Sequence, residues 1–499
     1  MKILSAEQIR QADAYTIAHE PIASIDLMER AAQRFVAAFY RHHDPKDPIA
    51  VICGTGNNGG DGLAISRILL SKGYQAQPYV VRTKEGGSAD FLENLARFQQ
   101  LGEVLFIAQE SNIPDFKPYQ TIIDALFGSG LSREVTGLYA RVIGAINNSG
   151  CKVVAVDIPS GLFVDRPAAA GGIICADETV SLQLPKLSLL MPENYRYVGH
   201  WQVVDIGLDQ DFIARQETAY STIEADEVGA MLPPRPKFAH KGTFGHGQLI
   251  GGSYGKMGAI TLAAGAFVRA GAGLLTTTIP ASGMPIMQMC VAEAMVLPQP
   301  GKHHITAFNS VPQAGAIGLG PGLGQEKATV KAYGDFLQVN DKPLVLDADA
   351  LNILSNTPAL LSLLPPETII TPHPKEFDRL AGPSSSHWQR ISRAREFAST
   401  WQVVIVLKGA HTAIITPQGQ VMFTTTGNPG MATGGSGDVL LGIITSLRAQ
   451  GLGALQAAVA GTWVHGRAGD LAAARQSMTA LKAGDIIAAL GDVFLEFSR

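Results

Sequence analysis

The chain has 499 residues, of which 46% are hydrophobic and 16% are charged, and its formal net charge is −4. This composition excludes a disordered or collagen-like chain. The lack of a basic run argues against nucleic acid as a main partner. The length exceeds the size at which a single core stops growing, so we expect more than one domain.

The N-terminal stretch "MKILSAEQIRQADAY" is interrupted by charged side chains where a secretory signal needs an apolar run. We expect a helix there instead, with Ser5 as its N-cap and Gln8 completing a capping box. No stretch of the sequence approaches the ~20 apolar residues that cross a bilayer. The four cysteines lie far apart without CxxC spacing, which favours neither a zinc site nor disulfides. We therefore expect a cytoplasmic protein without a membrane partner.

Short apolar runs alternate with helical stretches from about residue 48 to residue 206. This alternation predicts an α/β domain in which helices cover both faces of a parallel sheet, making three layers. The predicted strands are residues 49–54, 75–81, 119–126, 152–158 and 178–184.

Prolines and basic residues in "LPPRPKFAHKG" break this rhythm after a polar stretch, and we place the domain boundary near residue 218. The expected domains are therefore residues 1–218 and 219–499. The second domain repeats the α/β alternation and ends in alanine-rich helices. Its predicted strands are residues 247–253, 315–322, 343–349, 367–373, 402–409, 411–417 and 420–426.

The stretch "GTGNNGGDG" at residues 54–62 joins the first predicted strand to a helix. Its glycines let a ligand approach the backbone, and the helix N-terminus favours an anion such as phosphate. Asp124 and Asp157 lie near the ends of later strands. Together with Asn58 and Ser160 they can supply oxygen atoms to a hard cation or act on a proton. The alternative is that the loop is only a tight turn and the aspartates cap helices.

The motifs "GTGNNGGDG", "DALFGSGL" and "VDIPSGL" resemble the N-terminal domain of the YjeF family, the NAD(P)H-hydrate epimerases, over about residues 1–215. The resemblance implies a Rossmann-like domain in which Asn58, Asp124 and Ser160 bind K⁺. The stretch "FVDRPAAAGG" replaces the usual "DADTG", which leaves the contacts of that loop open. The residues implied to hold the damaged dinucleotide are Asn57, Asn58, Gly59, Gly60, Asp61, Gly128, Ser129, Gly130, Leu131, Ser132, Arg133, Glu134 and Asp157.

The stretch "GNPGMATGGSGDVLLG" in the second domain has the features of a phosphate site. Gly434, Gly435 and Gly437 free the backbone to surround a phosphoryl group, and the following helix adds its positive end. Asp438 can then take the proton of an attacking hydroxyl group. The alternative is that Asp438 only caps the helix.

Other candidates in this domain are weaker when taken alone. Lys408 follows a strand and either reaches a phosphate or is solvated, and His373 between two prolines is either a site residue or a surface histidine. Asp347 and Asp349 in "DADALN" can be read as a metal pair, but we favour helix capping.

Residues 225–499 resemble the ADP-dependent NAD(P)H-hydrate dehydratases of the ribokinase-like superfamily through "GPGLG", "DADALN", "TPHPKEF", "LKGAHT" and "GNPGMATGGSGDVL". Lys375 replaces the glycine that is usual beside the histidine. The implied substrate contacts are Ala259, Gly322, His373 and Asp438. The implied nucleotide contacts are Lys408, Gly409, Ala410, His411, Thr412, Gly434, Gly435 and Gly437.

Both halves together resemble the bifunctional enzymes that repair hydrated NADH and NADPH. The resemblance implies that the first domain interconverts the R and S hydrates at C6, with Asp157 handling a proton. The second dehydrates the S hydrate with ADP or ATP and Mg²⁺, with Asp438 as catalytic base, releasing AMP and phosphate when ADP is used. The expected partners are these small molecules and further copies of the chain.

Two alternatives from other classes remain at this stage. The second domain can be a small-molecule kinase of the hydroxymethylpyrimidine or hydroxyethylthiazole kind, because a glycine loop and an aspartate serve any hydroxyl substrate. The first domain can be a binding module without catalysis, although Asn58, Asp124 and Asp157 are all present.

Overall fold

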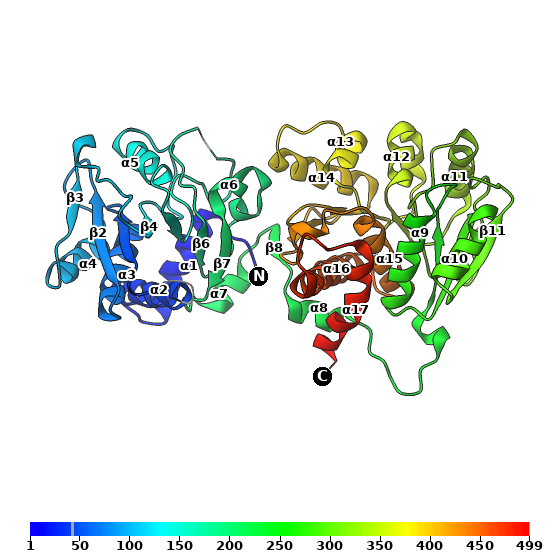
Figure 1. Cartoon of the computed structure of the whole chain (residues 1–499), viewed down its shortest axis with the longest axis horizontal. Coiled ribbons are helices and arrows are strands. Elements are labelled where there is room, and N and C mark those ends of the chain that lie inside the picture. The colour runs from blue at the N-terminus through cyan, green and yellow to red at the C-terminus, as the bar shows by residue number, and fades with distance from the viewer. Residues whose placement is uncertain (41–43, 169, 499) are drawn as a thin grey trace. The chain divides into compact units, whose positions relative to one another are not determined.

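The computed structural model describes residues 1–40, 44–168 and 170–498. The chain divides into two compact units, Met1–Tyr220 and Ser221–Arg499 (Figure 1). Each unit contains its own largely parallel sheet, so the predicted α/β class is confirmed for both halves.

In the described part of the first unit, seven strands form a sheet in the order β3-β2-β1-β4-β5-β6-β7, and neighbouring strands pair in parallel. The five predicted strands are confirmed, whereas β3 and β7 were not predicted. The strands are β1 (Pro48–Cys53), β2 (Gln75–Val81), β3 (Leu105–Ile107), β4 (Thr121–Ala125), β5 (Lys152–Val156), β6 (Glu178–Leu182) and β7 (His200–Val204).

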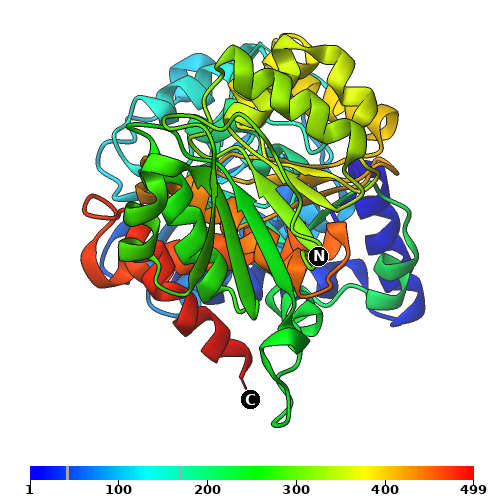
Figure 2. The same ribbon diagram turned by 90° about the vertical axis from the view of Figure 1, so that its right-hand side faces the viewer.

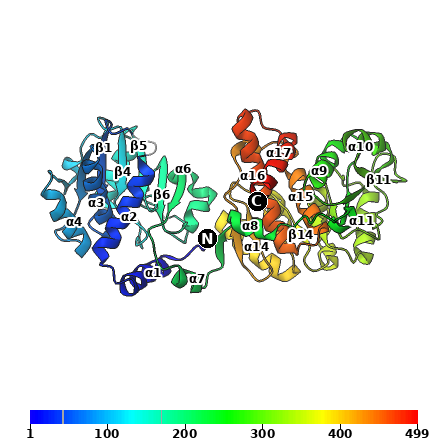
Figure 3. The ribbon, with the colours of Figure 1, turned by 90° about the horizontal axis from the view of Figure 1, so that it is seen from below.

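Helices cover both faces of this sheet: α2 and α3 lie on one side (Figures 1 and 3) and α5 lies on the other (Figure 1). Alternate residues of β1 serve the two faces: Val51 packs toward α2, α3 and α4, whereas Ile52 packs toward α5. The helices are α1 (Ala6–His19), α2 (Ser24–Phe39), α3 (Asn57–Ser71), α4 (Ala89–Gln99), α5 (Gly137–Asn147), α6 (Tyr195–Val198) and α7 (Gln210–Arg215).

Helix α1 begins as its sequence predicts. The Ser5 side chain accepts a hydrogen bond from the Gln8 backbone N–H, and the Gln8 side chain accepts one from the Ser5 N–H at 3.0 Å, which confirms the capping box. The buried residues Ile9 and Ala12 then pack into the cluster formed around the ends of β6 and β7. The helix is therefore held at the edge of the sheet where the strands end.

In the described part of the second unit, the sheet has ten strands in the order β11-β10-β9-β12-β13-β14-β15-β16-β17-β8. The first seven strands in this order, from β11 through β10 and β9 to β15, pair in parallel. The pairs β15–β16 and β16–β17 are antiparallel. The seven predicted strands are confirmed, but β8, β10 and β11 were not predicted. Figure 2 shows the green strands β9 to β11 side by side. The strands are β8 (Tyr220–Thr222), β9 (His246–Ile250), β10 (Leu274–Pro280), β11 (Ala294–Gln299), β12 (Ala316–Leu319), β13 (Leu344–Leu346), β14 (Ile369–Ile370), β15 (Val404–Leu407), β16 (Ala413–Ile415) and β17 (Val421–Phe423).

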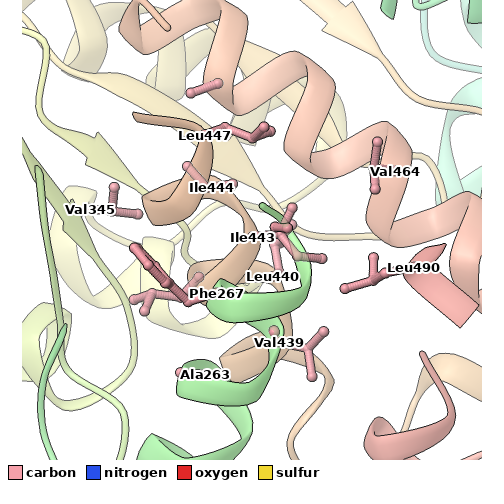
Figure 4. Packing of buried hydrophobic residues seen from close by; sticks show 14 of the residues in the cluster. Ala263, Phe267, Val345, Val439, Leu440, Ile443, Ile444, Leu447, Val464 and Leu490 are labelled. Carbon is pink, nitrogen blue, oxygen red and sulfur yellow. The ribbon is translucent and has the colours of Figure 1, made fainter. Parts of the chain in front are cut away.

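The core of the second unit lies between α9, α15, α16 and α17 and the sheet (Figure 4). Gly442 allows α15 to approach α9 closely, because a Cβ atom there would lie 2.2 Å from the Ala263 carbonyl oxygen. Among the described helices, none combines the length and the apolar character that a membrane span requires. The helices are α8 (Ala225–Met231), α9 (Met257–Arg269), α10 (Met284–Cys290), α11 (Lys327–Val339), α12 (Asp349–Asn356), α13 (Pro374–Ala381), α14 (His387–Trp401), α15 (Ser436–Ala449), α16 (Ala454–Gln476) and α17 (Ala483–Phe497).

Candidate active sites

A cavity of about 480 Å³ opens in the first unit where the strand order reverses between β1 and β4. Loops that follow the carboxyl ends of β1, β4, β5, β6 and β7 line it, and α1 adds one more wall. Ligands of open α/β sheets bind at this position. The cavity is therefore the candidate site of this unit.

Most of the predicted dinucleotide contacts line this cavity. Gly59, Gly60 and Glu134 do not: the two glycines are buried, and Glu134 is exposed. A Cβ atom at Gly59 would lie 1.9 Å from the Gly54 carbonyl oxygen, so this glycine allows the close packing of α3 on its own preceding loop. The predicted residues that line the cavity are Asn57, Asn58, Asp61, Gly128, Ser129, Gly130, Leu131, Ser132, Arg133 and Asp157.

Asp124 and Ser160 form a buried hydrogen-bonded pair at the ends of β4 and β5. Asp124 accepts hydrogen bonds from the Ser160 hydroxyl at 2.7 Å, the Ser160 N–H at 2.8 Å and the Leu126 N–H at 3.2 Å. Burial raises the pKa of Asp124 to about 6, although these hydrogen bonds oppose the shift. Among the described residues, Asp124 has no cationic side-chain partner. Beside this group, the Asn58 amide nitrogen is buried without a hydrogen-bond partner, and a Cβ atom at Gly128 would lie 3.0 Å from the Asn58 oxygen.

Asp157 lies directly after β5 in the left-handed region, with φ of 71°. The buried Lys186 ammonium donates to Asp157 Oδ1, to Ser181 Oγ at 2.9 Å and to the Leu182 carbonyl oxygen at 2.9 Å. The Leu182 N–H also donates to Asp157 Oδ1 at 3.1 Å. A strained backbone held by a buried ion pair is typical of a functional site. Neither Lys186 nor Asp13 is among the residues predicted from the sequence, and Asp13 lines the cavity.

In the second unit, Asp438 lies in the first turn of α15, after a left-handed Gly435 with φ of 93°. Burial raises the pKa of Asp438 to about 7, the charge of Asp347 adds to this shift, and the charge of Lys408 opposes it. A carboxyl group with this pKa at a glycine turn and a helix N-terminus is suited to act as a general base near neutral pH.

Lys408 is not a solvated strand-end lysine. Its ammonium donates to Asp347 Oδ1 at 2.8 Å and lies 3.9 Å from Glu376 Oε2. Burial lowers the pKa of Lys408, but these two carboxylates outweigh burial and raise it. A Cβ atom at Gly437 would lie 3.3 Å from both Asp347 Oδ2 and Lys408 Nζ, so the ion pair lies against the phosphate turn.

The expectation that Asp347 and Asp349 cap a helix is wrong. Helix α12 has Ala348 as its N-cap and lacks a side-chain cap, because Asp347 is engaged by Lys408. Asp349 instead accepts a hydrogen bond from the Gly324 N–H at 2.8 Å and so fixes the glycine turn after β12. Within the described residues, no group of three or more His, Cys, Asp and Glu side chains is arranged to hold a metal ion.

The other predicted residues of this unit lie around the same strand ends. His373 is the N-cap of α13, and its Nδ1 accepts from the Lys375 and Glu376 N–H groups at 3.2 and 3.3 Å. Burial lowers the pKa of His373. A Cβ atom at Gly322 would lie 3.4 Å from that of Ala259, which places these two predicted substrate contacts together.

The predicted nucleotide loop, residues 408–412, is a tight turn closed by the Gly409 N–H, which donates to Thr412 Oγ1 at 3.2 Å. It contains Ala410 and His411, and burial lowers the pKa of His411. A Cβ atom at Gly434 would find no atom within 4 Å, so that part of the glycine turn is open.

Two residues of α16 support the glycine stretch and were missed in the sequence. Asp470 accepts hydrogen bonds from the Gly427 N–H and the Asn428 amide, both at 2.9 Å. His465 Nε2 lies 3.3 Å from the Ser436 hydroxyl, and burial lowers its pKa to about 4, so its ring is neutral. Neither residue belongs to a glycine motif, which left no local signal for its role.

Comparisons with known proteins find relatives of both units. Residues 248–490 match the family model described as NAD(P)H-hydrate dehydratase, and residues 24–188 match the one described as YjeF-related protein N-terminus. The chain is 38% identical to a bifunctional NAD(P)H-hydrate repair enzyme of Moorella thermoacetica, over 98% of this chain and 95% of the relative. It is 34% identical to the enzyme of the same name from Escherichia coli, over 88% and 84% of the two chains.

The solved structures that resemble the chain include a ribokinase-like superfamily protein from Enterococcus faecalis. It is 27% identical, with a TM-score of 0.50, and the match covers 56% of this chain and 98% of that protein. The likeness agrees with a ribokinase-like fold for one half of the chain.

Proposed function

The chain belongs to the family of bifunctional NAD(P)H-hydrate repair enzymes, and we propose how its two units divide the repair of hydrated NADH and NADPH. The first unit epimerises the hydrate at C6, and the second dehydrates the S hydrate with ADP or ATP. The observation that carries this assignment is the arrangement of Asp438, the glycine turn and the Lys408–Asp347 pair in the second unit.

In the dehydratase site, hydroxide is a poor leaving group and must first be converted to a phosphate ester. The Asp438 carboxylate takes the proton of the C6 hydroxyl, whose oxygen attacks the terminal phosphoryl group of the nucleotide. The glycine turn, residues 434–437, and the positive end of α15 stabilise the charge on that phosphoryl group. The ring nitrogen then expels phosphate, and loss of a proton from C5 restores the dihydropyridine.

Lys408 is placed to neutralise the phosphate because it lies against Gly437. Its pairing with Asp347 and Glu376 keeps the ammonium charged and fixes its position in the turn. Mg²⁺ bound to the nucleotide would supply further charge neutralisation to the phosphates. With ADP as donor, the products are NAD(P)H, AMP and phosphate.

In the epimerase site, the residues present fit a potassium ion. Asp124 is a buried carboxylate without a cationic partner among the described residues. The side-chain nitrogen of Asn58 is buried and has no hydrogen-bond partner. Turning that amide presents its carbonyl oxygen, the kind of ligand that a hard cation takes. Asn58, Asp124 and Ser160 would hold the ion, which supplies positive charge near the dinucleotide phosphates, while Asp157 handles a proton at C6.

Absorbance at 340 nm tests the whole assignment. We expect it to rise toward the full hydrate content when the protein is mixed with both NADH hydrate epimers, ADP, Mg²⁺ and K⁺, and to stay flat without ADP. A rise that stops once the S hydrate is consumed would contradict the epimerase assignment. A stable phosphorylated product without NADH would instead identify the second unit as a small-molecule kinase.

The pH dependence of dehydration follows from Asp438. Because the base acts only when ionised and its pKa is raised to about 7, we expect kcat/KM for the S hydrate to fall about tenfold per pH unit below pH 7 and to level off above it. Asp347→Asn removes a charge that raises this pKa, so the falling limb should move to lower pH. A limb that stays in place in Asp347→Asn would contradict the assignment of the limb to Asp438.

A further inference from the structure

Helix α1 contributes an acidic residue, Asp13, to the epimerase cavity. The family model for this unit matches from residue 24 onward, so α1 lies outside that match. The helix is nevertheless a fixed wall of the cavity, because Ser5 caps it and Ile9 and Ala12 pack with Leu184. Asp13 therefore lies on a wall of the cavity that is held by a helix cap and by buried apolar packing.

Asp13 lines the cavity together with two further aspartates, Asp61 and Asp157. Asp157 is held by Lys186, whereas Asp13 and Asp61 form neither a hydrogen bond nor an ion pair with any described residue. Burial raises the pKa of Asp13 to about 6, the charge of Asp157 adds to the shift, and the charge of Lys186 opposes it. Asp13 therefore gains and loses a proton near neutral pH, in a cavity that it shares with Asp157, which is ion-paired with Lys186.

Among the described residues, none of the other charged groups around α1 forms an ion pair with Asp13. Arg10 also lines the cavity but pairs with Glu7, and Arg133 lies on the loop after β4. Helix α7 packs against α1 through Arg215, whose guanidinium donates to the Tyr15 hydroxyl at 3.3 Å.

Asp61 is a poorer proton donor than Asp13. Burial, followed by the charges of Asp157, Asp13 and Asp90, raises the pKa of Asp61 well above its ordinary value. A carboxyl group with a strongly raised pKa gives up its proton less readily, whereas Asp13, with a pKa of about 6, can cycle its proton at the operating pH.

Resting on the epimerase activity proposed above, we infer that Asp13 is a catalytic acid of the first unit, which protonates the C6 hydroxyl of the hydrate as it leaves. The C6–O bond breaks, its electron pair goes to oxygen, and water departs while the ring nitrogen lone pair forms a C6=N1 iminium. Water then adds to the other face of C6 and gives a proton to the Asp157 carboxylate. Proton exchange with solvent resets the two carboxyl groups, so the net change is inversion at C6 without a co-reactant.

The variant Asp13→Asn, made in the full-length chain, tests the role of this acid. ADP is omitted so that the second unit cannot dehydrate the hydrate, and chromatography follows conversion of the R hydrate to the S hydrate. We expect epimerase kcat to fall about 100-fold or more, the loss typical of a missing general acid. Dehydration of pure S hydrate with ADP should stay within about twofold, as should both activities of the control Asp26→Asn, which changes an exposed aspartate of α2. Full epimerase activity in a folded Asp13→Asn variant would overturn the inference.

Asp13→Glu keeps the inference testable if the asparagine variant fails to fold. Because it retains an acid, it should recover much of the epimerisation and keep a kcat that falls as pH rises above about 6, where the donor loses its proton. A pH-independent kcat in wild type and Asp13→Glu would contradict the acid role. If the wild-type protein does not epimerise the R hydrate faster than the reaction without enzyme, this result contradicts the proposed epimerase function. It is thereby distinguished from a failure of the role assigned to Asp13.

Labelled water tests the leaving step by a readout other than rate. In a single turnover in H₂¹⁸O, each S hydrate formed should carry one solvent oxygen at C6, above the exchange seen without enzyme. Retention of the original oxygen would overturn departure of the hydroxyl.

Discussion

Replacing Asp438 by asparagine is expected to lower dehydration of the S hydrate by about 10³-fold while epimerisation stays near the wild-type rate. Asparagine keeps the size of the side chain in the first turn of α15 but cannot take the hydroxyl proton, and a general base contributes ~10²–10⁴ in rate. The loss should appear in kcat at 340 nm with saturating ADP, and chromatography without ADP should show normal interconversion of the epimers.

The matched control is Asp335→Asn, which removes an exposed carboxylate of α11 that pairs with Lys331. Such surface pairs contribute only ~0–1 kcal/mol, so this variant should keep both activities. Simultaneous loss of both activities in Asp438→Asn, with the control unaffected, would contradict two separate sites.

The parts of both sites that could be predicted are those whose signal is local. A glycine turn at the end of a strand can be recognised from a few consecutive residues. Asp438 and the loop of residues 54–62 were predicted in this way. The capping box of Ser5 and Gln8 is equally local, and the structure confirms it. Such features need only neighbouring residues, so a single sequence contains the whole argument for them.

The interactions that could not be predicted join residues that are distant in the chain. Lys408 meets Asp347 across 61 positions and Lys186 meets Asp157 across 29, so neither pairing has a local pattern. The wrong capping prediction for Asp347 has the same origin, because its position beside a helix start is visible in the sequence and its cationic partner is not.

The missed strand β10 has a different cause. Its sequence LLTTTIP contains three threonines, which count as polar in a hydrophobic pattern although β-branched residues favour strands. All three are buried because their hydroxyls find partners: Thr276 contacts His246 at 2.8 Å, and Thr278 accepts from Gln248 at 2.8 Å. Burial of a polar strand depends on such cross-strand bonds, which appear only once the neighbours are known.

Asp157→Asn is expected to abolish epimerisation, so that an equal mixture of the hydrates is consumed only about halfway on the enzymatic timescale. Asparagine tolerates the left-handed backbone at this position better than alanine does, which keeps the substitution isosteric and unstrained. It also removes the counter-charge of the buried Lys186, and breaking such a pair costs ~3–5 kcal/mol. Lost activity in this variant alone would therefore mix two effects, catalysis and folding.

The double variant Asp157→Asn with Lys186→Met separates these effects. Methionine keeps a long side chain in the buried site but removes the unpaired charge, so hydrogen exchange at the β5 and β6 amides should return toward the wild-type rate. Epimerisation should remain absent, because the carboxylate that handles the proton is still missing. Recovery of epimerisation together with stability would show that Asp157 supports the fold and that the chemistry depends on another group.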